Sequence, residues 1–218
     1  MISATEALER LQKGNKRFLP EPKKDDVNRR SAWLNLASSK HKPDSEKPSL
    51  PKQKPFAIVL GCSDARVPLE IVFDQGLGDL FVVRVAGNIV APSLIGSVEF
   101  AATEFGTRLV VVMGHSNCGA IAATLKELEQ PSENRSPNLA SIVDRISPAI
   151  EPLVKNSRSI DRETLMEEAV RANVHASVNQ LQSGSTILKD LIRKDGLQIL
   201  GAEYSIENGN VNFLDRAE

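Results

Sequence analysis

Four side chains with metal-binding chemistry lie in two short segments of the sequence. Cys62 and Asp64 are two residues apart, and His115 and Cys118 are three residues apart. Residues two apart in an extended segment face the same way, and a helical turn brings residues three apart to one side. Two thiolates, one imidazole and one carboxylate form a tetrahedral ligand set that favours zinc. The sequence therefore predicts a zinc site, one ion per chain, with the ligands Cys62, Asp64, His115 and Cys118.

Cys62 and Cys118 are the only cysteines of the chain, and other interpretations of them stay open. Buried free thiols commonly behave as small apolar side chains. A disulfide is not expected in a reducing compartment, although a redox pair would also use two cysteines. A redox pair predicts that the purified protein contains no zinc. A position for Cys118 near a helix N-terminus favours its thiolate, which suits a metal ligand.

Arg66 decides what such a site could do. It lies two residues beyond Asp64, where its guanidinium can compete for the carboxylate. If Asp64 binds the metal, protein fills all four positions and no place remains for a substrate. If Asp64 pairs with Arg66, the fourth position opens to water, and zinc makes that water acidic enough to supply hydroxide near neutral pH. A surface ion pair is the commoner role of an arginine and stays an alternative.

Three short apolar runs predict the strands that would position these residues. They are rich in Val and occupy residues 56–60, 80–85 and 109–113. Runs of this kind, separated by segments of helix length, are typical of buried parallel strands. The expected intervening helices cover residues 68–73, 93–104 and 118–129. This βαβ pattern predicts an α/β fold with a mainly parallel central β-sheet flanked by helices.

Both candidate ligand segments directly follow predicted strands. Residues 61–66 come after the first run, and residues 115–119 come after the third. Ligand sites in open α/β sheets lie just beyond the carboxyl ends of the strands. The expected fold therefore brings both segments to the edge of the sheet where chemistry usually takes place.

The two ends of the chain add further elements to this core. Ser3 and Glu6 have capping-box spacing, which predicts a helix over about 4–17. A polar connection follows at 20–55. The C-terminal helical region plus edge strand is expected at 139–154, 160–181, 185–194, 197–204 and 211–214. We expect a single domain over 1–218, with an N-terminal helical arm and polar connection at 1–54 and a zinc-binding α/β core at 55–218.

The overall composition is that of an ordinary globular protein. Of 218 residues, 41% are hydrophobic and 25% are charged, and the formal net charge is -1. This balance provides no field that would attract nucleic acid or an anionic membrane, so neither is expected as a partner. The sequence shows no signal peptide and no apolar stretch of about 18 residues. The cytoplasm is the expected location, with an internal microcompartment or organelle left open.

Two motifs in this chain resemble the signatures of the β-class carbonic anhydrases. They are CSDARV at 62–67 and GHSNCG at 114–119, and the segments at 73–88 and 199–204 are also similar to the family. The resemblance spans essentially the whole chain apart from about 20–50. It implies zinc bound by three fixed ligands, with Asp64 as the exchangeable fourth. The pair of Asp64 and Arg66 would then act as a gate and position a zinc hydroxide that attacks carbon dioxide, giving bicarbonate and a proton.

The resemblance also implies residues beyond the metal ligands. Gln53 occupies the position of a substrate-binding glutamine that typically reaches across a dimer interface. The substrate pocket would include Phe81, Phe100 and Gly119, although core packing is an equal expectation for Phe100. Members of the family are homodimers or dimers of dimers in which N-terminal helices embrace the neighbouring subunit.

One family feature is not expected here. Some bacterial members have an inhibitory bicarbonate pocket that uses a tryptophan three residues before the first cysteine. This chain has Val59 at that position, although Arg84 and Tyr204 stand at the other matching places. The remaining histidines, His41 and His175, are not expected to act as proton shuttles.

Two other functions use the same residues. Carbon disulfide and carbonyl sulfide hydrolases resemble the family and share its ligands, so access to the pocket would distinguish them. A non-catalytic zinc-binding homologue would be expected to lose Asp64, Arg66 or Gln53. The chain keeps all three, which favours an enzyme.

Overall fold

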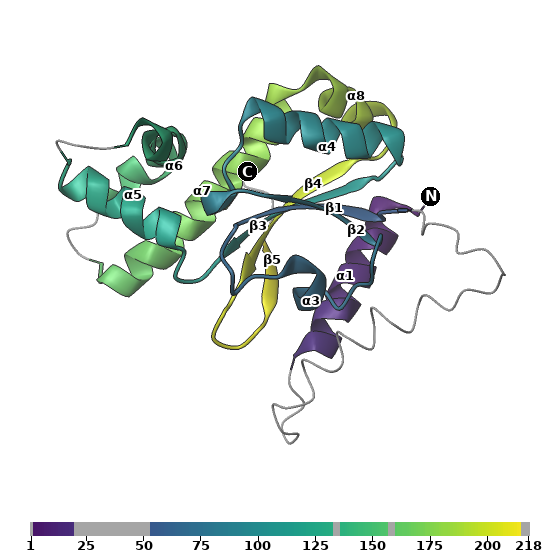
Figure 1. Cartoon of the computed structure of the whole chain (residues 1–218), viewed down its shortest axis with the longest axis horizontal. Helices are drawn as coiled ribbons and strands as arrows, with labels where there is room; N and C mark the ends of the chain where they lie inside the picture. The colour runs from purple at the N-terminus through teal and green to yellow at the C-terminus, as the bar shows by residue number, and fades with distance from the viewer. Residues whose placement is uncertain (1, 20–52, 133–135, 157–159, 215–218) are drawn as a thin grey trace.

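A central β-sheet organises the computed structural model, which describes residues 2–19, 53–132, 136–156 and 160–214. Within these residues the sheet has five strands in the order β2-β1-β3-β4-β5 (Figure 1). They are β1 (Ala57–Gly61), β2 (Leu80–Arg84), β3 (Leu109–His115), β4 (Gln198–Tyr204) and β5 (Val211–Leu214). The strands β2, β1, β3 and β4 are parallel, and β5 pairs with β4 in the antiparallel direction. The predicted α/β fold, with a mainly parallel sheet and a C-terminal edge strand, is therefore confirmed.

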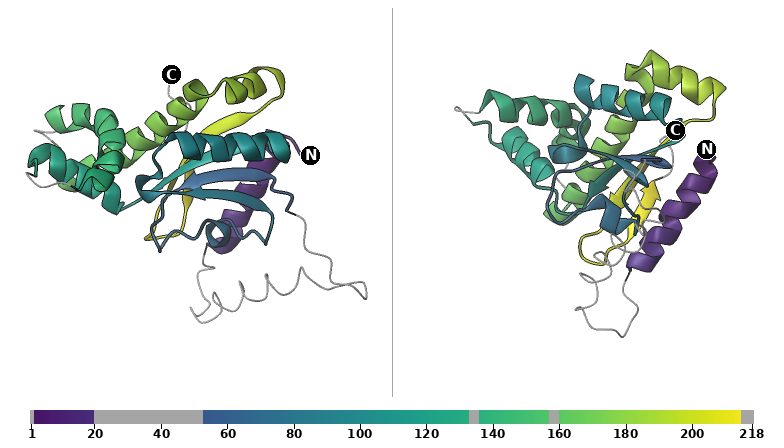
Figure 2. Two further views of the ribbon diagram at one scale, coloured as in Figure 1. Left: turned by 45° about the horizontal axis from the view of Figure 1, so that its top comes forward. Right: turned by 45° about the vertical axis from the view of Figure 1, so that its right-hand side comes forward.

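Helices cover both faces of this sheet (Figures 1 and 2). They are α1 (Ala4–Phe18), α3 (Leu69–Val72), α4 (Pro92–Glu104), α5 (Gly119–Glu129), α6 (Pro137–Asn156), α7 (Arg162–Gly184) and α8 (Thr186–Lys194). Each begins and ends within three residues of its expected bounds. Residues 20–52 of the predicted polar connection, with His41, lie outside the described residues.

The core has three parts, which follow from the alternation of side chains along the strands. In β1, Val59 points to the face covered by α1 and α3, whereas Ile58 and Leu60 point to the face covered by α4, α7 and α8. Both faces are buried, which explains why the run at 56–60 is continuously apolar. The third part lies among α5, α6 and α7, beyond the carboxyl ends of the strands, and includes Cys62 and Cys118.

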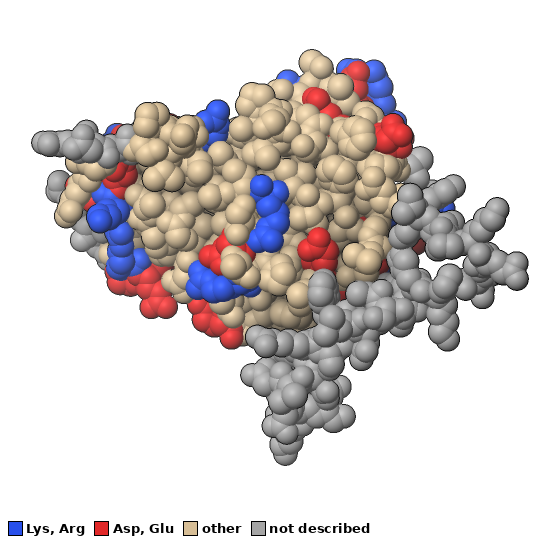
Figure 3. Space-filling view, viewed as in Figure 1, with Lys and Arg blue, Asp and Glu red and all other residues tan. Residues whose placement is uncertain are grey.

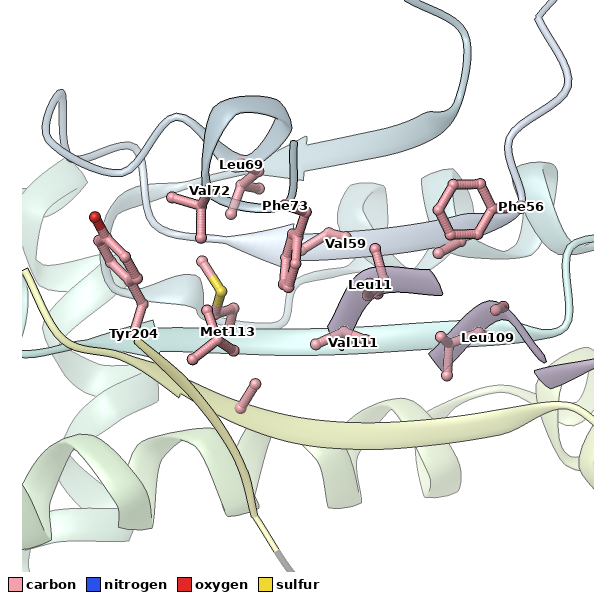
Figure 4. Close-up of a cluster of buried hydrophobic side chains, with 14 of the residues drawn as sticks. Leu11, Phe56, Val59, Leu69, Val72, Phe73, Leu109, Val111, Met113 and Tyr204 are labelled. Atoms are coloured by element: carbon pink, nitrogen blue, oxygen red, sulfur yellow. The ribbon is translucent and has the colours of Figure 1, made fainter. Parts of the chain in front are cut away.

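Helix α1 packs on the sheet of its own chain. Leu11 is fully buried and lies between Phe73 and Val111 (Figure 4). Gly14 permits this close approach, because a Cβ there would lie 1.8 Å from the Phe73 carbonyl oxygen. The contact with a neighbouring subunit that the family resemblance implied for this helix stays a prediction.

Asn15 fastens α1 to two distant parts of the chain. Its Nδ2 donates to the carbonyl oxygens of Val72 at 3.0 Å and Gly209 at 2.9 Å, and its Oδ1 accepts from the Val211 nitrogen at 3.0 Å. The Asn15 side chain is buried, so water could not supply these hydrogen bonds if the side chain were removed.

The described surface mixes charges of both signs. On the face seen in Figure 3, large uncharged areas surround small groups in which Lys or Arg lies next to Asp or Glu. This pattern agrees with the near-zero net charge. None of the described helices combines the length and the apolar character that a bilayer crossing requires.

Replacing Asn15 by alanine tests how much α1 contributes to stability. Asn15→Ala leaves three buried backbone groups unpaired, and we expect the free energy of unfolding to fall by about 2–4 kcal/mol. The neighbouring exposed Lys16→Ala should change it by less than about 0.5 kcal/mol. Urea denaturation at one fixed protein concentration measures both. Equal stability of the two variants would show that α1 is not held by this side chain.

Candidate metal centre

Cys62 lies one residue beyond β1, where a turn after β2 reaches its sulfur. The Gly87 backbone nitrogen donates to Cys62 Sγ at 3.3 Å. This turn is held from α7, since Asn173 Nδ2 donates to the Gly87 carbonyl at 2.8 Å and Ser177 Oγ donates to the Asn88 carbonyl at 3.0 Å. The position of the thiol therefore depends on a helix more than a hundred residues away in the sequence.

His115 is the last residue of β3, and its imidazole is fully buried. Nδ1 lies 2.9 Å from the Ser116 carbonyl oxygen. Because a carbonyl only accepts, Nδ1 carries the proton and Nε2 presents a lone pair. Within the described residues, Nε2 is buried with no hydrogen-bond partner. An imidazole held by a backbone carbonyl through one nitrogen, with the other free, is the usual arrangement of a metal-ligating histidine.

Cys118 completes the cluster from the N-terminus of α5, where it is the N-cap residue. Its Sγ lies 4.0 Å from Cys62 Sγ, and both cysteines are free. The sulfur atoms are therefore not joined as a disulfide, whose bond length is about 2.05 Å. The distance is close to the roughly 3.8 Å expected for two sulfurs about 2.3 Å from one tetrahedral zinc ion. The ligand atoms of Cys62, His115 and Cys118 all lie within 4.8 Å of one another.

The electrostatics of this cluster favour one thiolate. A hydrogen bond from the Cys118 thiol lowers the pKa of Cys62, and the same contact raises the pKa of Cys118. Burial opposes protonation of His115, but the nearby Cys62 sulfur and the Ser116 carbonyl favour the charged imidazole, outweigh burial and raise its pKa. Two sulfurs compete for one proton beside a polarised imidazole, and a dication would relieve this competition. The three side chains thus fit zinc by geometry and by charge.

Asp64 is held by Arg66. Arg66 Nε donates to Asp64 Oδ1 at 3.0 Å and Nη2 donates to Oδ2 at 2.8 Å, which is a bidentate pair. The Arg66 backbone nitrogen also donates to Oδ1 at 2.9 Å. Asp64 Oδ2 lies 3.9 Å from His115 Nε2, so the carboxylate stands beside the cluster. Of the two arrangements considered for Asp64, the structure has the one in which it pairs with the arginine.

The pair with Arg66 also sets the ionisation of Asp64. Hydrogen bonds from the guanidinium hold the pKa of the carboxyl well below its usual range. A lowered carboxyl pKa means that the pair contributes its stabilisation above the ordinary carboxyl pKa and loses it only as the pH falls through the lowered value. Asp64 therefore stays ionised, and an acceptor only, in weakly acidic solution.

Arg84 braces the same loop from β2. Its Nε donates to the Cys62 carbonyl at 2.9 Å, and its Nη2 donates to the Asp64 carbonyl at 2.7 Å. Val59 and Tyr204, at the other positions of the inhibitory pocket found in some relatives, lie in the apolar cluster beneath α1 (Figure 4). The sequence marked Arg84 only through that pocket, and nothing in its spacing indicated contacts with the loop.

The remaining predicted site residues lie elsewhere in the chain, apart from Gly119. Gly119 follows Cys118 and is exposed. Gln53 is exposed at the amino end of β1, whereas Cys62 lies beyond its carboxyl end. Phe81 pairs in register with Ile58, and its ring centroid lies 6.2 Å from that of Phe100, which is 51% exposed on α4. Within one chain, the structure therefore does not bring Gln53, Phe81 and Phe100 to the sulfur atoms.

Comparisons with known proteins agree with this fold and site. A sequence model of the carbonic anhydrase family matches residues 57–211. A carbonic anhydrase of Mycolicibacterium smegmatis is 40% identical over 161 residues, covering 74% of this chain and 75% of that protein. Carbonic anhydrase 2 of Mycobacterium tuberculosis is 32% identical over 210 residues, covering 94% of this chain and 90% of that protein.

Solved structures extend the likeness to the fold. The β-carbonic anhydrase CafA of Aspergillus fumigatus superposes with a TM-score of 0.69 at 26% identity, covering 76% of this chain and 78% of that chain. The β-carbonic anhydrase CcaA gives a TM-score of 0.67 at 26% identity and covers 95% of both chains.

A mainly parallel sheet with a buried Cys-His-Cys cluster beyond its carboxyl ends defines the class of α/β proteins whose site is suited to a metal ion. The match over residues 57–211 and the two structural likenesses identify one family within this class. The chain belongs to the β-class of the carbonic anhydrase family, whose reaction is the reversible hydration of carbon dioxide.

Gly87 tests whether the turn over Cys62 is as constrained as its geometry indicates. Its φ is +70°, and a Cβ would lie 2.8 Å from Ile146 Cδ1 and 2.9 Å from Ala120 Cβ. We expect Gly87→Ala to lower the free energy of unfolding by about 1–3 kcal/mol, because the backbone is strained and the packing is overfilled. Gly96→Ala is the matched control, since its Cβ meets nothing within 4 Å in helix α4. That variant should be neutral or more stable by up to about 1 kcal/mol. Thermal unfolding compares the two, and equal melting temperatures would contradict the constraint.

Proposed function

We propose that the chain hydrates carbon dioxide reversibly to bicarbonate and a proton, using one zinc ion per chain held by Cys62, His115 and Cys118. The observation that carries the proposal is the buried His115 Nε2, which has no hydrogen-bond partner among the described residues and lies near two sulfurs, while Asp64 is paired with Arg66. A buried lone pair of this kind is costly unless a ligand completes it. Three protein ligands also leave the fourth tetrahedral position for water or substrate, as catalytic zinc sites require.

Each residue would contribute a separate physical effect. When bound, zinc supplies a Lewis acid that makes water nucleophilic near neutral pH. Asp64 is ionised and lies beside the cluster. It accepts a hydrogen bond from the attacking water, which directs the lone pair of the water oxygen at carbon dioxide. Arg66 keeps the carboxylate in that role, because the bidentate pair holds both of its oxygens.

The same pair would act as a gate. If Asp64 left Arg66, its Oδ2 would have only a short distance to move toward the ligand cluster, since it lies 3.9 Å from His115 Nε2. A carboxylate bound as the fourth ligand would close the site to substrate. The bidentate pair therefore supports an open site, and it is consistent with catalysis by this chain.

We also propose that the working unit is a homodimer or a dimer of dimers. Gln53 lies at the opposite end of β1 from Cys62, so it would have to reach the metal centre of a neighbouring subunit. The exposed Phe100 ring, packed on Phe81 and Phe105, is an apolar surface that a second subunit could cover. Phe81, Phe100 and Gly119 would then line the substrate pocket.

Zinc analysis together with an Arg66 variant tests the chemistry. We expect about one zinc per chain in the purified protein and rapid hydration of carbon dioxide at pH ~8.5, where hydroxide is available. Arg66→Ala should keep its zinc and lose on the order of 100-fold in kcat/KM, because Asp64 is no longer held. Arg193→Ala on the remote α8 helix is the control and should match the wild type.

Three outcomes would contradict the proposal. Absence of zinc would favour a redox pair of the two cysteines. Zinc without any wild-type activity would favour a non-catalytic homologue. Negligible hydration together with rapid hydrolysis of carbonyl sulfide or carbon disulfide would favour the sulfur substrates.

Mixing two inactive variants tests whether Gln53 acts across an interface. Gln53→Ala and Arg66→Ala are each expected to be nearly inactive. In a mixed dimer, the chain with intact Arg66 would receive Gln53 from its partner, so one of the two sites would be complete. Random mixing of symmetric dimers should then restore about a quarter of the wild-type activity. No recovery, with mixed dimers demonstrated by differently tagged chains, would show that Gln53 does not act from the partner.

A further inference from the structure

Two carbonyl groups of the segment between His115 and Cys118 contact different parts of the metal centre. The Ser116 carbonyl lies 2.9 Å from His115 Nδ1 and so directs the imidazole. The Asn117 carbonyl accepts from Arg66 Nη2 at 3.3 Å and so contacts the group that holds Asp64. Any shift of this dipeptide would therefore move a ligand and the gate together.

The backbone conformation of this dipeptide depends on contacts with other parts of the protein. Asn117 has a φ of +55°, in the left-handed region that non-glycine residues adopt only when their surroundings support it. Its side chain and that of Ser116 form hydrogen bonds with the turn that joins β4 to β5.

Glu207 in that turn binds both side chains. Its Oε2 accepts from Ser116 Oγ at 2.8 Å and from Ser205 Oγ at 2.9 Å, and its Oε1 accepts from Asn117 Nδ2 at 2.8 Å. Ser116 Oγ in turn accepts from the Ile206 nitrogen at 3.0 Å. One carboxylate therefore ties a segment about 90 residues away in the sequence to the edge of the sheet.

The negative charge of Glu207 strengthens the hydrogen bonds that hold Ser116 and Asn117. The hydrogen bond from Ser116, with those from Ser205 and Asn117, lowers the pKa of the carboxyl, so it is ionised near neutral pH. Glu207 also contributes to the raised pKa of Arg66, although Asp64 makes the larger contribution. The guanidinium is therefore under the influence of two carboxylates, although it forms its hydrogen-bonded pair with Asp64.

We propose that Glu207 is a positioning residue of the metal centre. By fixing Ser116 and Asn117, it keeps the lone pair of His115 directed at the metal and keeps Arg66 on Asp64. This inference rests on the proposed zinc function. In this role Glu207 contacts neither substrate nor metal. Loss of its carboxylate should let the site release its metal more readily.

The hollow beside Glu207 provides a matched control. It has a volume of about 630 Å³ and is also lined by Glu163 on α7. In the described part of the chain, the exposed Glu163 side chain makes no hydrogen bond to Ser116 or Asn117. Glu163→Ala therefore removes the same charge from the same hollow and leaves the dipeptide held.

Metal release measures the effect without relying on activity. Zinc-loaded wild type, Glu207→Ala, Glu207→Gln and Glu163→Ala are each mixed with a chelating dye, and the rate of zinc transfer is recorded. We expect Glu207→Ala to lose zinc up to about 10- to 100-fold faster, because metal affinity falls by that range when the hydrogen-bond partners of metal ligands are removed. Glu207→Gln keeps an acceptor for Asn117 and should lie between. Glu163→Ala should match the wild type.

Cobalt(II) substitution adds a spectroscopic readout. The absorption bands of cobalt(II) bound to two thiolates and an imidazole depend on ligand geometry, so they should shift in Glu207→Ala and not in Glu163→Ala. Zinc release and cobalt spectra of Glu207→Ala that equal those of the wild type would overturn the proposal. If Glu207→Ala does not fold, Glu207→Gln decides by the same criteria.

The two proposals can fail separately. A wild-type protein that binds neither zinc nor added cobalt(II) would refute the zinc function, and the role of Glu207 with it. Normal metal binding with unchanged release in the Glu207 variants would refute only the positioning role.

Discussion

The parallel pairing of β1 with β3 is the constraint on which the site depends. Gly61, at the end of β1, lies opposite Met113, and β3 continues for two more residues to His115. Cys62 and His115 therefore leave the sheet from adjacent strands at the same edge. A parallel pair places both carboxyl ends together, which an antiparallel pair could not do. Both faces of these strands are buried, so a slip in register would expose apolar side chains and is strongly disfavoured.

Arg66 and a metal ion would compete for the Asp64 carboxylate. The outcome would decide whether protein fills the fourth metal position or leaves it open to substrate. A bidentate pair of Arg66 with Asp64 has the strongest geometry available to two charged side chains, and it removes Asp64 from the ligand set. The three ligands that remain differ from Asp64 in burial as well as in chemistry. Cys62, His115 and Cys118 are buried, whereas Asp64 is half-buried beside an exposed arginine, which is consistent with the gate proposed for it.

Residues from distant parts of the chain hold the ligands in place. Asn173 on α7 holds the turn whose backbone nitrogen contacts Cys62, and Arg84 at the end of β2 holds the loop that carries Asp64. Glu207, from the last turn of the sheet, holds the segment before Cys118. Each of these side chains acts on a backbone carbonyl or a loop side chain. They contact the loops that carry the cluster and are not themselves part of it.

Much of this protein follows from its sequence alone. Continuous Val-rich runs separated by segments of helix length are typical of parallel strands, so the parallel sheet and its helices were predictable to within three residues. The cluster of Cys62, His115 and Cys118 was predictable because the spacing of these residues is short and their chemistry is rare in the chain. Only two cysteines exist, and both follow predicted strands directly.

Only the tertiary structure shows that Asp64 pairs with Arg66 and which distant residues hold the loops around the site. Spacing allowed Asp64 to bind either the metal or Arg66, and only the coordinates place both carboxylate oxygens on the guanidinium. Asn173 and Glu207 gave no signal, because Asn and Glu are common residues and their partners lie 86 and 90 residues away. The position of Gln53 at the amino end of β1, by contrast, follows from the predicted strand at 56–60. Local periodicity encodes which face a side chain takes, whereas contacts between distant loops arise only after the sheet has brought its edges together.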